Sequence, residues 1–308
     1  MNYDDVIAVA FQASPPEAVS PPTREPSPAR RFRDAIEPLA MHAVWSRTTV
    51  EALTALGLDF FTGYVWGRAA ALGNPSPGVV VSSFAVFEPS LLTGAYERAR
   101  ASADRAAVLD ARTTATIASL EAALGIGRDD PSLRWMANTL RTATSSAHTA
   151  GKPLYSGLLD QDWPSSHLGT IWHACELARE HRGDTHIAVC VQRGLDPAEM
   201  NILTELWVGY PFGTYSASRA WSTEVLDAAA HRLRDRGLIE DASVPVELSA
   251  EGRAFRGEIE RDTDQLQYPI IDALGPDTAA VVQQLDNWSQ QCIAARSFPP
   301  NVYKRAAG

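Results

Sequence analysis

The stretch that decides the fold is STEVLDAAAHRLRDRGLIE, residues 222–240, followed by VELSAEGRAFRGEIERDTD, residues 246–264. Ser222 is placed to cap a helix that ends near Gly237, a residue type that favours the left-handed C-cap position. The apolar residues of this segment recur at helical spacing, at Val225, Leu226, Ala229 and Leu233. The first half of the stretch therefore predicts one amphipathic helix with a defined start and end.

The second half of the stretch predicts a small hairpin and another helix. Leu238–Ile239 and Val246–Leu248 are short apolar runs on either side of an acidic turn, as in two paired strands. Ser249 then precedes a Pro-free segment and can cap the next helix. Upstream, Asp196 precedes a helix with Met200, Leu203 and Leu206. Residues 196–262 thus predict helix, helix, hairpin and helix, in that order.

This order of elements resembles the winged helix of the MarR type. In that family the matching stretch has a form like L..RGLV…LT..GR.L, and this chain has LRDRGLIE followed by ELSAEGRAF. The resemblance implies a mainly α-helical fold with small β-hairpin wings.

The rest of the chain is divided by its composition. Residues 1–29 are predicted to be a disordered, Pro-rich leader, because proline lacks an N–H and has a fixed φ angle; the prolines are Pro15, Pro16, Pro21, Pro22, Pro26 and Pro28. Helix signals dominate residues 30–150, the N-terminal winged-helix-like half. Residues 151–297 form the C-terminal half, with the winged helix at 196–262, and residues 298–308 are predicted to be a tail.

A faint internal repeat links the two halves. Gly57-Leu58-Asp59 matches Gly194-Leu195-Asp196, and each triplet is followed by a helix. Further along, residues 87–92 align with residues 221–226 after a small gap. The hypothesis is a tandem pseudo-repeat of two winged-helix-like halves. The alternative is that both segments are ordinary helix starts.

The helix at 222–235 has the wrong charge for reading DNA. Residues 222–241 carry the bases Arg232, Arg234 and Arg236 against the acids Glu224, Asp227, Asp235, Glu240 and Asp241. Lys and Arg supply most of the affinity of a protein for the phosphate backbone. DNA is therefore a partner that this surface disfavours, and the whole chain carries a net charge of −10.

The densest polar cluster is WHACELAREHRGDTH, residues 172–186. His173 and Glu180 share a helical face, while Gly183 is predicted to end one helix so that Asp184 caps the next. A turn there would return His186 towards His181. These four residues, His173, Glu180, His181 and His186, are candidate acid–base groups. No known metal signature is matched, so metal and cofactor stay open, and a solvated helix end with salt bridges is the alternative.

A second cluster, FFTGYVWGR at residues 60–68, places Tyr64 and Arg68 four residues apart on a helix. An aromatic ring beside a fixed guanidinium suits a planar anionic small molecule. The alternative is helix packing with Arg68 tied to an internal carboxylate. The candidate ligand-binding residues are Tyr64, Trp66, Arg68, Trp172, Arg182 and Asp184, with His173 and His181 beside them.

The bulk properties exclude several classes of protein. Cys175, Cys190 and Cys292 are odd in number and form no CxxC, which indicates a reducing compartment. No secretory signal or membrane-length apolar run occurs, so a cytoplasmic protein without a membrane partner is predicted. No GxGxxG, Walker loop or GxSxG motif occurs either.

The chain also resembles an actinobacterial family of helix-turn-helix proteins. The resemblance rests on IWHACELAREHRGDTHIAV, with LGLDFFTGYVWGRAAALG upstream and RLRDRGLIE downstream. Family members usually read RAAPLG after the arginine, whereas this chain has Ala71 in place of the proline. The resemblance implies a MarR-like winged-helix fold and a cytoplasmic location, and it carries no assigned activity.

Three hypotheses for function follow: ligand binding, catalysis and a purely structural role in binding a partner protein. The first is a small-molecule-binding winged-helix protein, a transcriptional regulator or a ligand-binding protein derived from one, with its pocket between the halves. The alternative is an enzyme of specialised metabolism that uses the His and Glu side chains of residues 172–186. The sequence does not indicate the ligand, the oligomeric state or whether DNA is bound.

Overall fold

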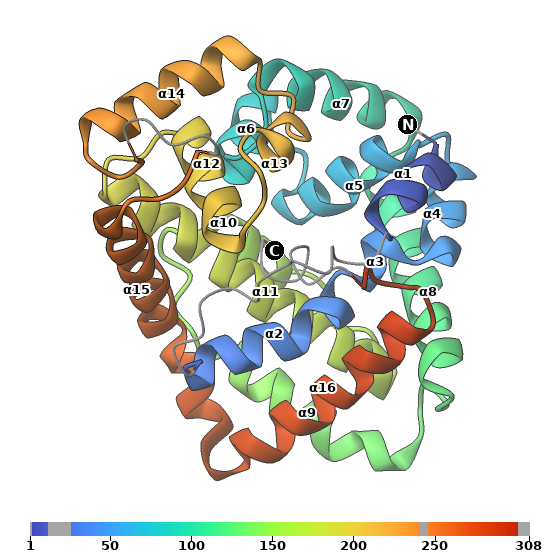
Figure 1. Cartoon of the computed structure of the whole chain (residues 1–308). Coiled ribbons are helices and arrows are strands. Elements are labelled where there is room, and N and C mark those ends of the chain that lie inside the picture. Colours follow the sequence, from blue (N-terminus) through green and yellow to red (C-terminus); the bar gives the residue numbers. More distant parts are fainter. Residues whose placement is uncertain (1, 12–25, 241–245, 301–308) are drawn as a thin grey trace.

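The computed structural model describes residues 2–11, 26–240 and 246–300, and it is mainly helical (Figure 1). Within those ranges no strand forms, and the one β-bridge pairs Ile239 with Leu248. The elements are α1 (Tyr3–Ala10), α2 (Pro28–Ala40), α3 (His42–Trp45), α4 (Arg47–Thr54), α5 (Phe60–Ala69), η1 (Ala70–Leu72), α6 (Pro77–Phe84), α7 (Pro89–Ser102), α8 (Arg105–Leu124), η2 (Pro131–Leu133), α9 (Arg134–Thr144), α10 (Pro153–Leu159), α11 (His167–Gln192), α12 (Pro197–Val208), α13 (Thr214–Ala217), α14 (Thr223–Asp235), α15 (Ala250–Leu274), η3 (Gly275–Asp277) and α16 (Thr278–Ala294).

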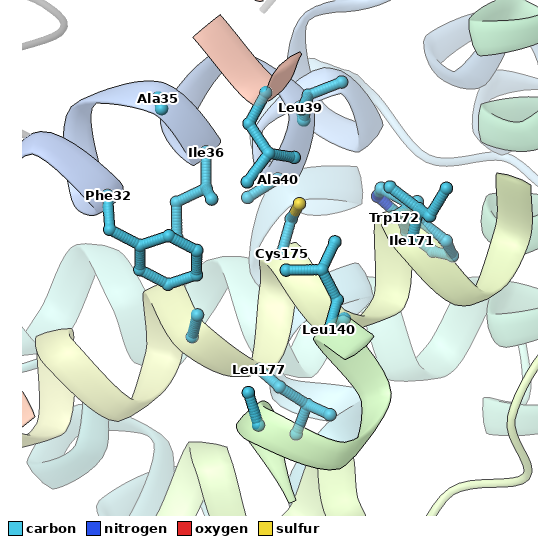
Figure 2. Packing of buried hydrophobic residues seen from close by; sticks show 14 of the residues in the cluster. Phe32, Ala35, Ile36, Leu39, Ala40, Leu140, Ile171, Trp172, Cys175 and Leu177 are labelled. Carbon is cyan, nitrogen blue, oxygen red and sulfur yellow. The ribbon is translucent and has the colours of Figure 1, made fainter. Parts of the chain in front are cut away.

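Helix α11 is the centre of the molecule. It packs against α2, α8, α9, α10 and α15, so that most of its side chains from Leu168 to Thr185 are buried (Figure 1). Figure 2 shows the apolar part of this packing, with Ile36 and Leu39 of α2 facing Cys175 and Trp172 of α11. A helix buried on nearly every side draws its stability from packing, not from an amphipathic pattern.

Two smaller cores flank this centre. Helices α5, α6 and α7 enclose one of them, around Trp66, Leu92 and Tyr96. Helices α12, α14 and α15 enclose the other, around Ile202, Leu233 and Ile259. None of the helices in the described part of the chain is both long and apolar enough to cross a membrane.

The two smaller cores meet through the turns that precede α7 and α14. Glu88 donates its backbone N–H to the carbonyl of Arg219 at 2.9 Å. The Trp221 indole and the Asn201 amide both donate to the carbonyl of Val86, at 2.9 and 2.8 Å. These bonds fix the N-terminal half against the C-terminal half.

The prediction of a disordered leader over residues 1–29 is wrong at both of its ends. Residues 3–10 form α1, which Asn2 caps by accepting from the N–H of Asp4, and α2 already begins at Pro28. Proline is tolerated in the first turn of a helix because that N–H has no intrahelical partner. Residues 12–25 lie outside the described part of the chain.

The predicted tail at 298–308 begins too early, because its first residue is part of the fold. Phe298 is 2% exposed and belongs to the interior, while residues 301–308 lie outside the described part of the chain.

The predicted turn at Gly183 is also wrong, because α11 continues through it without a break to Gln192. Asp184 does cap a helix, but the helix is α10: its carboxylate accepts the backbone N–H of Tyr155 at 3.0 Å. A glycine inside a helix costs about 1 kcal/mol relative to alanine, a cost that burial on all sides outweighs here.

The predicted wing is reduced to a single bridge in the described residues, and residues 241–245 lie outside them. Glu240 donates its N–H to the carbonyl of Glu247 at 3.0 Å, and Ser249 donates to Leu238 at 3.1 Å. The Leu238 carbonyl lies so close to α15 that a Cβ added at Gly252 would be 1.9 Å from its oxygen. This contact explains why glycine follows Leu-Ser-Ala-Glu in the motif.

Replacing Gly252 by alanine is therefore expected to lower the free energy of unfolding by about 3 kcal/mol, since backbone must move to relieve the overlap. Gly257 lies in the same helix, and a Cβ there would make only ordinary contacts at 3.6 Å or more. Gly257→Ala is expected to raise stability by about 0.5–1 kcal/mol through helix propensity. Urea denaturation of the two variants measures both values, and equal effects would contradict the close approach of Leu238.

Candidate functional site

A cavity lies between α11 and the α2–α5 segment, and its two walls differ in chemistry. The apolar wall comes from α2, Met41, α3 and α4, with Ala40, Met41, Ala43, Val44, Val50 and Leu53. The polar wall comes from α5, α8 and α11, with Tyr64, Arg68, Arg112, Glu176, Arg179 and Glu180. Asp59, Phe60 and Gly63 complete the lining at the start of α5. The cavity is therefore amphipathic, as small-molecule sites usually are.

The polar wall is built around the carboxylate of Glu180. Arg68 of α5 donates to it with two nitrogens, Nε at 2.9 Å and Nη2 at 2.7 Å. Arg179 adds a third bond from Nη1 at 3.1 Å and reaches the carboxylate of Glu37 with Nε at 3.2 Å. Burial tends to raise the pKa of Glu180, but the Arg68 and Arg179 guanidinium groups hold it at about 2.

A second ion pair lies beside the first. Arg112 of α8 meets the carboxylate of Glu176 in a two-pronged contact. Its guanidinium lies 5.2 Å from the ring centroid of Trp172. Burial raises the pKa of the Glu176 carboxyl, and the Arg112 charge opposes that rise. The pair anchors α8 to α11 within the polar wall of the cavity.

Arg68 and Arg179 keep part of their surface free of these ion pairs. Their side chains are 16% and 17% exposed, whereas the Glu180 carboxylate between them is 8% exposed. Arg68 Nη1 makes only a long contact, 3.4 Å, with the Tyr64 hydroxyl. The two guanidinium groups and the Tyr64 phenol therefore line the cavity together with the Glu180 carboxylate that the arginines share.

Of the predicted ligand-binding residues, the structure brings Tyr64 and Arg68 into the cavity wall. Trp66 points the other way, 1% exposed, and donates its indole N–H to the carbonyl of Ala103 at 2.9 Å. Trp172 is buried beneath Arg112. The helical repeat separates these residues, because Tyr64 and Trp66 stand on different faces of α5.

Arg182 and Asp184 lie away from the cavity and have structural partners. Arg182 bonds to Asp264 at 2.7 Å and to Glu260 at 2.9 Å, which ties α11 to α15. Asp184 caps α10, and its burial raises the pKa of its carboxyl to about 7.

The predicted acid–base residues are not brought together. The ring of His173 packs edge-on against Trp163 at 4.7 Å between centroids, and that of His181 against Tyr155 at 5.0 Å. His186 contacts Thr263 and Cys190. The Glu180 carboxylate is bonded to Arg68 and Arg179. Among the residues that the structure describes, no three His, Cys, Asp or Glu side chains gather closely enough to hold a metal ion.

Sequence reasoning missed Arg112, Arg179 and Glu37 as members of the site. A signal for Arg179 was present, since Glu176, Arg179 and Glu180 are three and four residues apart on one helix. Arg112 and Glu37 come from α8 and α2, and only the packing of these helices on α11 brings them close.

The fold and the site define a mainly helical protein with an amphipathic, charged cavity beside its central helix. The chain matches the model of the family described as the Helix-turn-helix family over residues 29–299, and it belongs to that family. Membership suggests a protein of the DNA-binding, regulator-like kind. No curated protein and no solved structure matches the chain.

Proposed function

We propose that this protein is a small-molecule-binding protein derived from a regulator, and that its ligand is a planar aromatic carboxylate held in the cavity between α5 and α11. The observation that carries the proposal is the pair of partly exposed guanidinium groups of Arg68 and Arg179 facing an apolar wall.

The donors fit a carboxylate. The Arg68–Glu180 ion pair fixes the guanidinium plane, so that little rotamer entropy remains to be lost when a ligand binds. Charge-assisted hydrogen bonds from arginine are among the stronger polar contacts in proteins. The opposite wall, with Val44, Val50 and Leu53, would cover the faces of an aromatic ring. A ligand with an acid at one end and a flat apolar body satisfies both walls.

The fold supports descent from winged-helix halves. Asp59 caps α5 and Asp196 caps α12 through the same bond to the third helical residue, and α5 packs on α7 as α12 packs on α14. In this proposal the two halves imitate a dimer within one chain. A crystal structure in which α4–α7 failed to superpose on the end of α11 and α12–α14 would contradict the proposed repeat.

The proposed repeat also explains why only the N-terminal half would carry the ligand site. The alignment of Asp59 with Asp196 puts Arg68 opposite Glu205. Glu205 is fully buried and accepts the backbone N–H groups of Gly213, Tyr215 and Ser216. Its carboxylate therefore stabilises the segment that follows α12. The C-terminal half therefore lacks the guanidinium on which the proposed site depends.

Helix α14, the counterpart of a DNA-reading helix, supports ligand binding over DNA binding. Its Arg232 is paired with Asp196 and Glu199. Arg236 donates to backbone carbonyls at the end of α11. Arg234 is half-buried, and the exposed carboxylates of the helix are those of Glu224, Asp227 and Asp235. We therefore place no nucleic acid on this helix.

Titration calorimetry with benzoate and with benzamide tests the proposal. Benzoate is expected to bind with a saturable signal, and benzamide, which has the same shape without the charge, at least tenfold more weakly, the factor that about 1.4 kcal/mol of lost charge-assisted bonding gives. Arg68→Lys retains the charge but loses the planar fork, and the same weakening is expected for benzoate.

Arg193→Lys is the matched control, because Arg193 also bonds two carboxylates, Glu258 and Asp262, but lies away from the cavity. Its benzoate affinity should equal that of the wild type. Equal binding of benzoate and benzamide, or no binding of either, would contradict the proposed site.

A further inference from the structure

The cavity is too small, as it stands, for the ligand proposed above. Its volume is about 30 Å³, which is room for one or two water molecules and far below the several hundred Å³ of a usual small-molecule site. A second hollow of about 330 Å³ lies next to it, between α1, α4 and the start of α5. The two hollows share Val50, Asp59 and Phe60 as lining residues, so these side chains form the wall between them.

Phe60 is the member of this wall that is suited to move. It stands at the first position of α5, where it is half-buried and its ring lies beside two other rings. The centroid of the Trp45 ring lies 5.6 Å from it, and that of Tyr3 lies 6.1 Å from it. Tyr3 belongs to α1 and also lines the outer hollow, so α1 holds the outer side of the wall.

Helix α1 lies on the surface of the described part of the chain and contributes little to its core. Of its residues, all of which the structure describes, only Ala10 is buried. The Tyr3 hydroxyl donates to the carbonyl of Trp45 at 2.7 Å, and an exposed ion pair joins Asp4 to Arg47. Exposed ion pairs contribute little to stability, about 0–1 kcal/mol. Undocking of α1 therefore disrupts far less packing than movement of any core helix would.

We propose that Phe60 is a gate between the inner cavity and the outer hollow, and that Tyr3 on α1 latches this gate closed. When Tyr3 leaves, the Phe60 ring can swing into the outer hollow, and the two spaces become one of the size that small-molecule sites usually have. The inference rests on the proposed function in that the gate controls entry to the same site, and it adds α1 as the element that regulates access.

Cysteine labelling measures access to the cavity without any ligand. Ala43 lines the inner cavity and is 3% exposed, so Ala43→Cys in the full chain places a thiol behind the gate. The probe is 5,5′-dithiobis(2-nitrobenzoate), which carries aromatic carboxylates. Its reaction rate is expected to rise at least roughly tenfold when Tyr3→Ala is added, because a ring contact and a hydrogen bond are lost. Phe60→Ala should give a similar rise.

Two controls separate the latch from general loosening. Val9→Ala changes an α1 side chain that is 72% exposed and should leave the rate unchanged. Tyr3→Phe keeps the ring and loses only the bond to Trp45, so an intermediate rate is expected. The native Cys175, Cys190 and Cys292 are buried elsewhere and should stay unlabelled throughout.

The outcomes distinguish this inference from the proposed function. Labelling rates equal to that of Ala43→Cys alone, in both Tyr3→Ala and Phe60→Ala, would overturn the gate whether or not benzoate binds. A rise in Val9→Ala equal to that in Tyr3→Ala, or labelling of the native cysteines at the same rate as the introduced thiol, would also overturn it. Faster labelling with no benzoate binding in calorimetry would uphold the gate and defeat only the proposed ligand class.

Discussion

Glu180→Leu is expected to lower the free energy of unfolding by roughly 3–5 kcal/mol, because it leaves two charged groups without their shared partner. Arg68 loses both of its bonds to the carboxylate, and Arg179 keeps only Glu37. Burial of an uncompensated guanidinium is costly, whereas loss of an exposed ion pair costs about 0–1 kcal/mol. Urea denaturation followed by circular dichroism measures the difference.

Glu258→Ala is the control for this loss. Glu258 bonds Arg193 at 2.9 Å but is 48% exposed, so its removal should cost less than about 1 kcal/mol. The double variant Arg68→Met with Glu180→Leu removes both charges and should recover part of the lost stability. A single variant as mild as Glu258→Ala would show that the Glu180 carboxylate is not the charge on which the cavity wall depends.

Mild acid is expected to destabilise the protein steeply. Burial lowers the pKa of His42, His181 and His186 to about 3 and that of His173 to about 4. In the unfolded chain a histidine takes up a proton below about pH 6.5. The unfolded state therefore binds more protons between about pH 4 and 6.5, and stability falls as the pH falls through that range.

The carboxyl of Asp184 has the opposite effect on stability as the pH falls. Burial raises the pKa of its carboxyl to about 7, so below that pH the folded state binds a proton that the unfolded chain binds only near about pH 4. This carboxyl offsets one of the four histidines. Burial also raises the pKa of Glu176 and Glu205, which act in the same direction. At most three net protons remain, so the slope near pH 5 is expected to reach no more than about 4 kcal/mol per pH unit.

Urea midpoints at pH 7.5, 6.5 and 5.5 test this expectation: little change between the first two and a large drop at the third. His181→Phe should reduce the slope by about 1.4 kcal/mol per pH unit, since one protonating group is removed. His231, whose side chain is 75% exposed, is the control, and His231→Gln should leave the slope unchanged. A flat profile down to pH 5 would contradict burial of the neutral rings.

Helix boundaries were predictable where a single local rule decides them. Gly125 ends α8 in the left-handed conformation, Asp196 and Glu199 form a reciprocal capping box, and Ser222 and Ser249 each accept the N–H three residues on. Each of these bonds lies within four residues of sequence. The coarse expectation of a mainly helical, helix-turn-helix protein is confirmed.

Predictions failed where distant contacts outweigh local rules. Gly183-Asp184 has the local chemistry of a helix end, yet burial against α10 and α15 keeps α11 continuous. The leader looked structureless because of its prolines, but Tyr3 donates to the Trp45 carbonyl and Phe11 packs on the Trp45 ring, far along the chain. Neither contact leaves a pattern in the nearby sequence.

About half of the candidate site was predictable from the sequence. Tyr64 and Arg68 stand out because their spacing puts them on one helical face, and the alternative of an internal carboxylate for Arg68 is what the structure contains, in Glu180. The partner is 112 residues away, and Arg112 joins from a third helix. The spacing along one helix is readable, whereas the pairing between helices is set by the packing of the core.

A crystal structure with 4-iodobenzoate tests the central claim most directly, because the anomalous signal of iodine locates the ligand without interpretation of its shape. The expected result is one strong iodine position between Phe60 and the apolar wall, with the carboxylate on Arg68 and Arg179 and the Phe60 ring displaced towards α1. Iodine found only outside this cavity, in crystals that contain the bound ligand, would contradict the account.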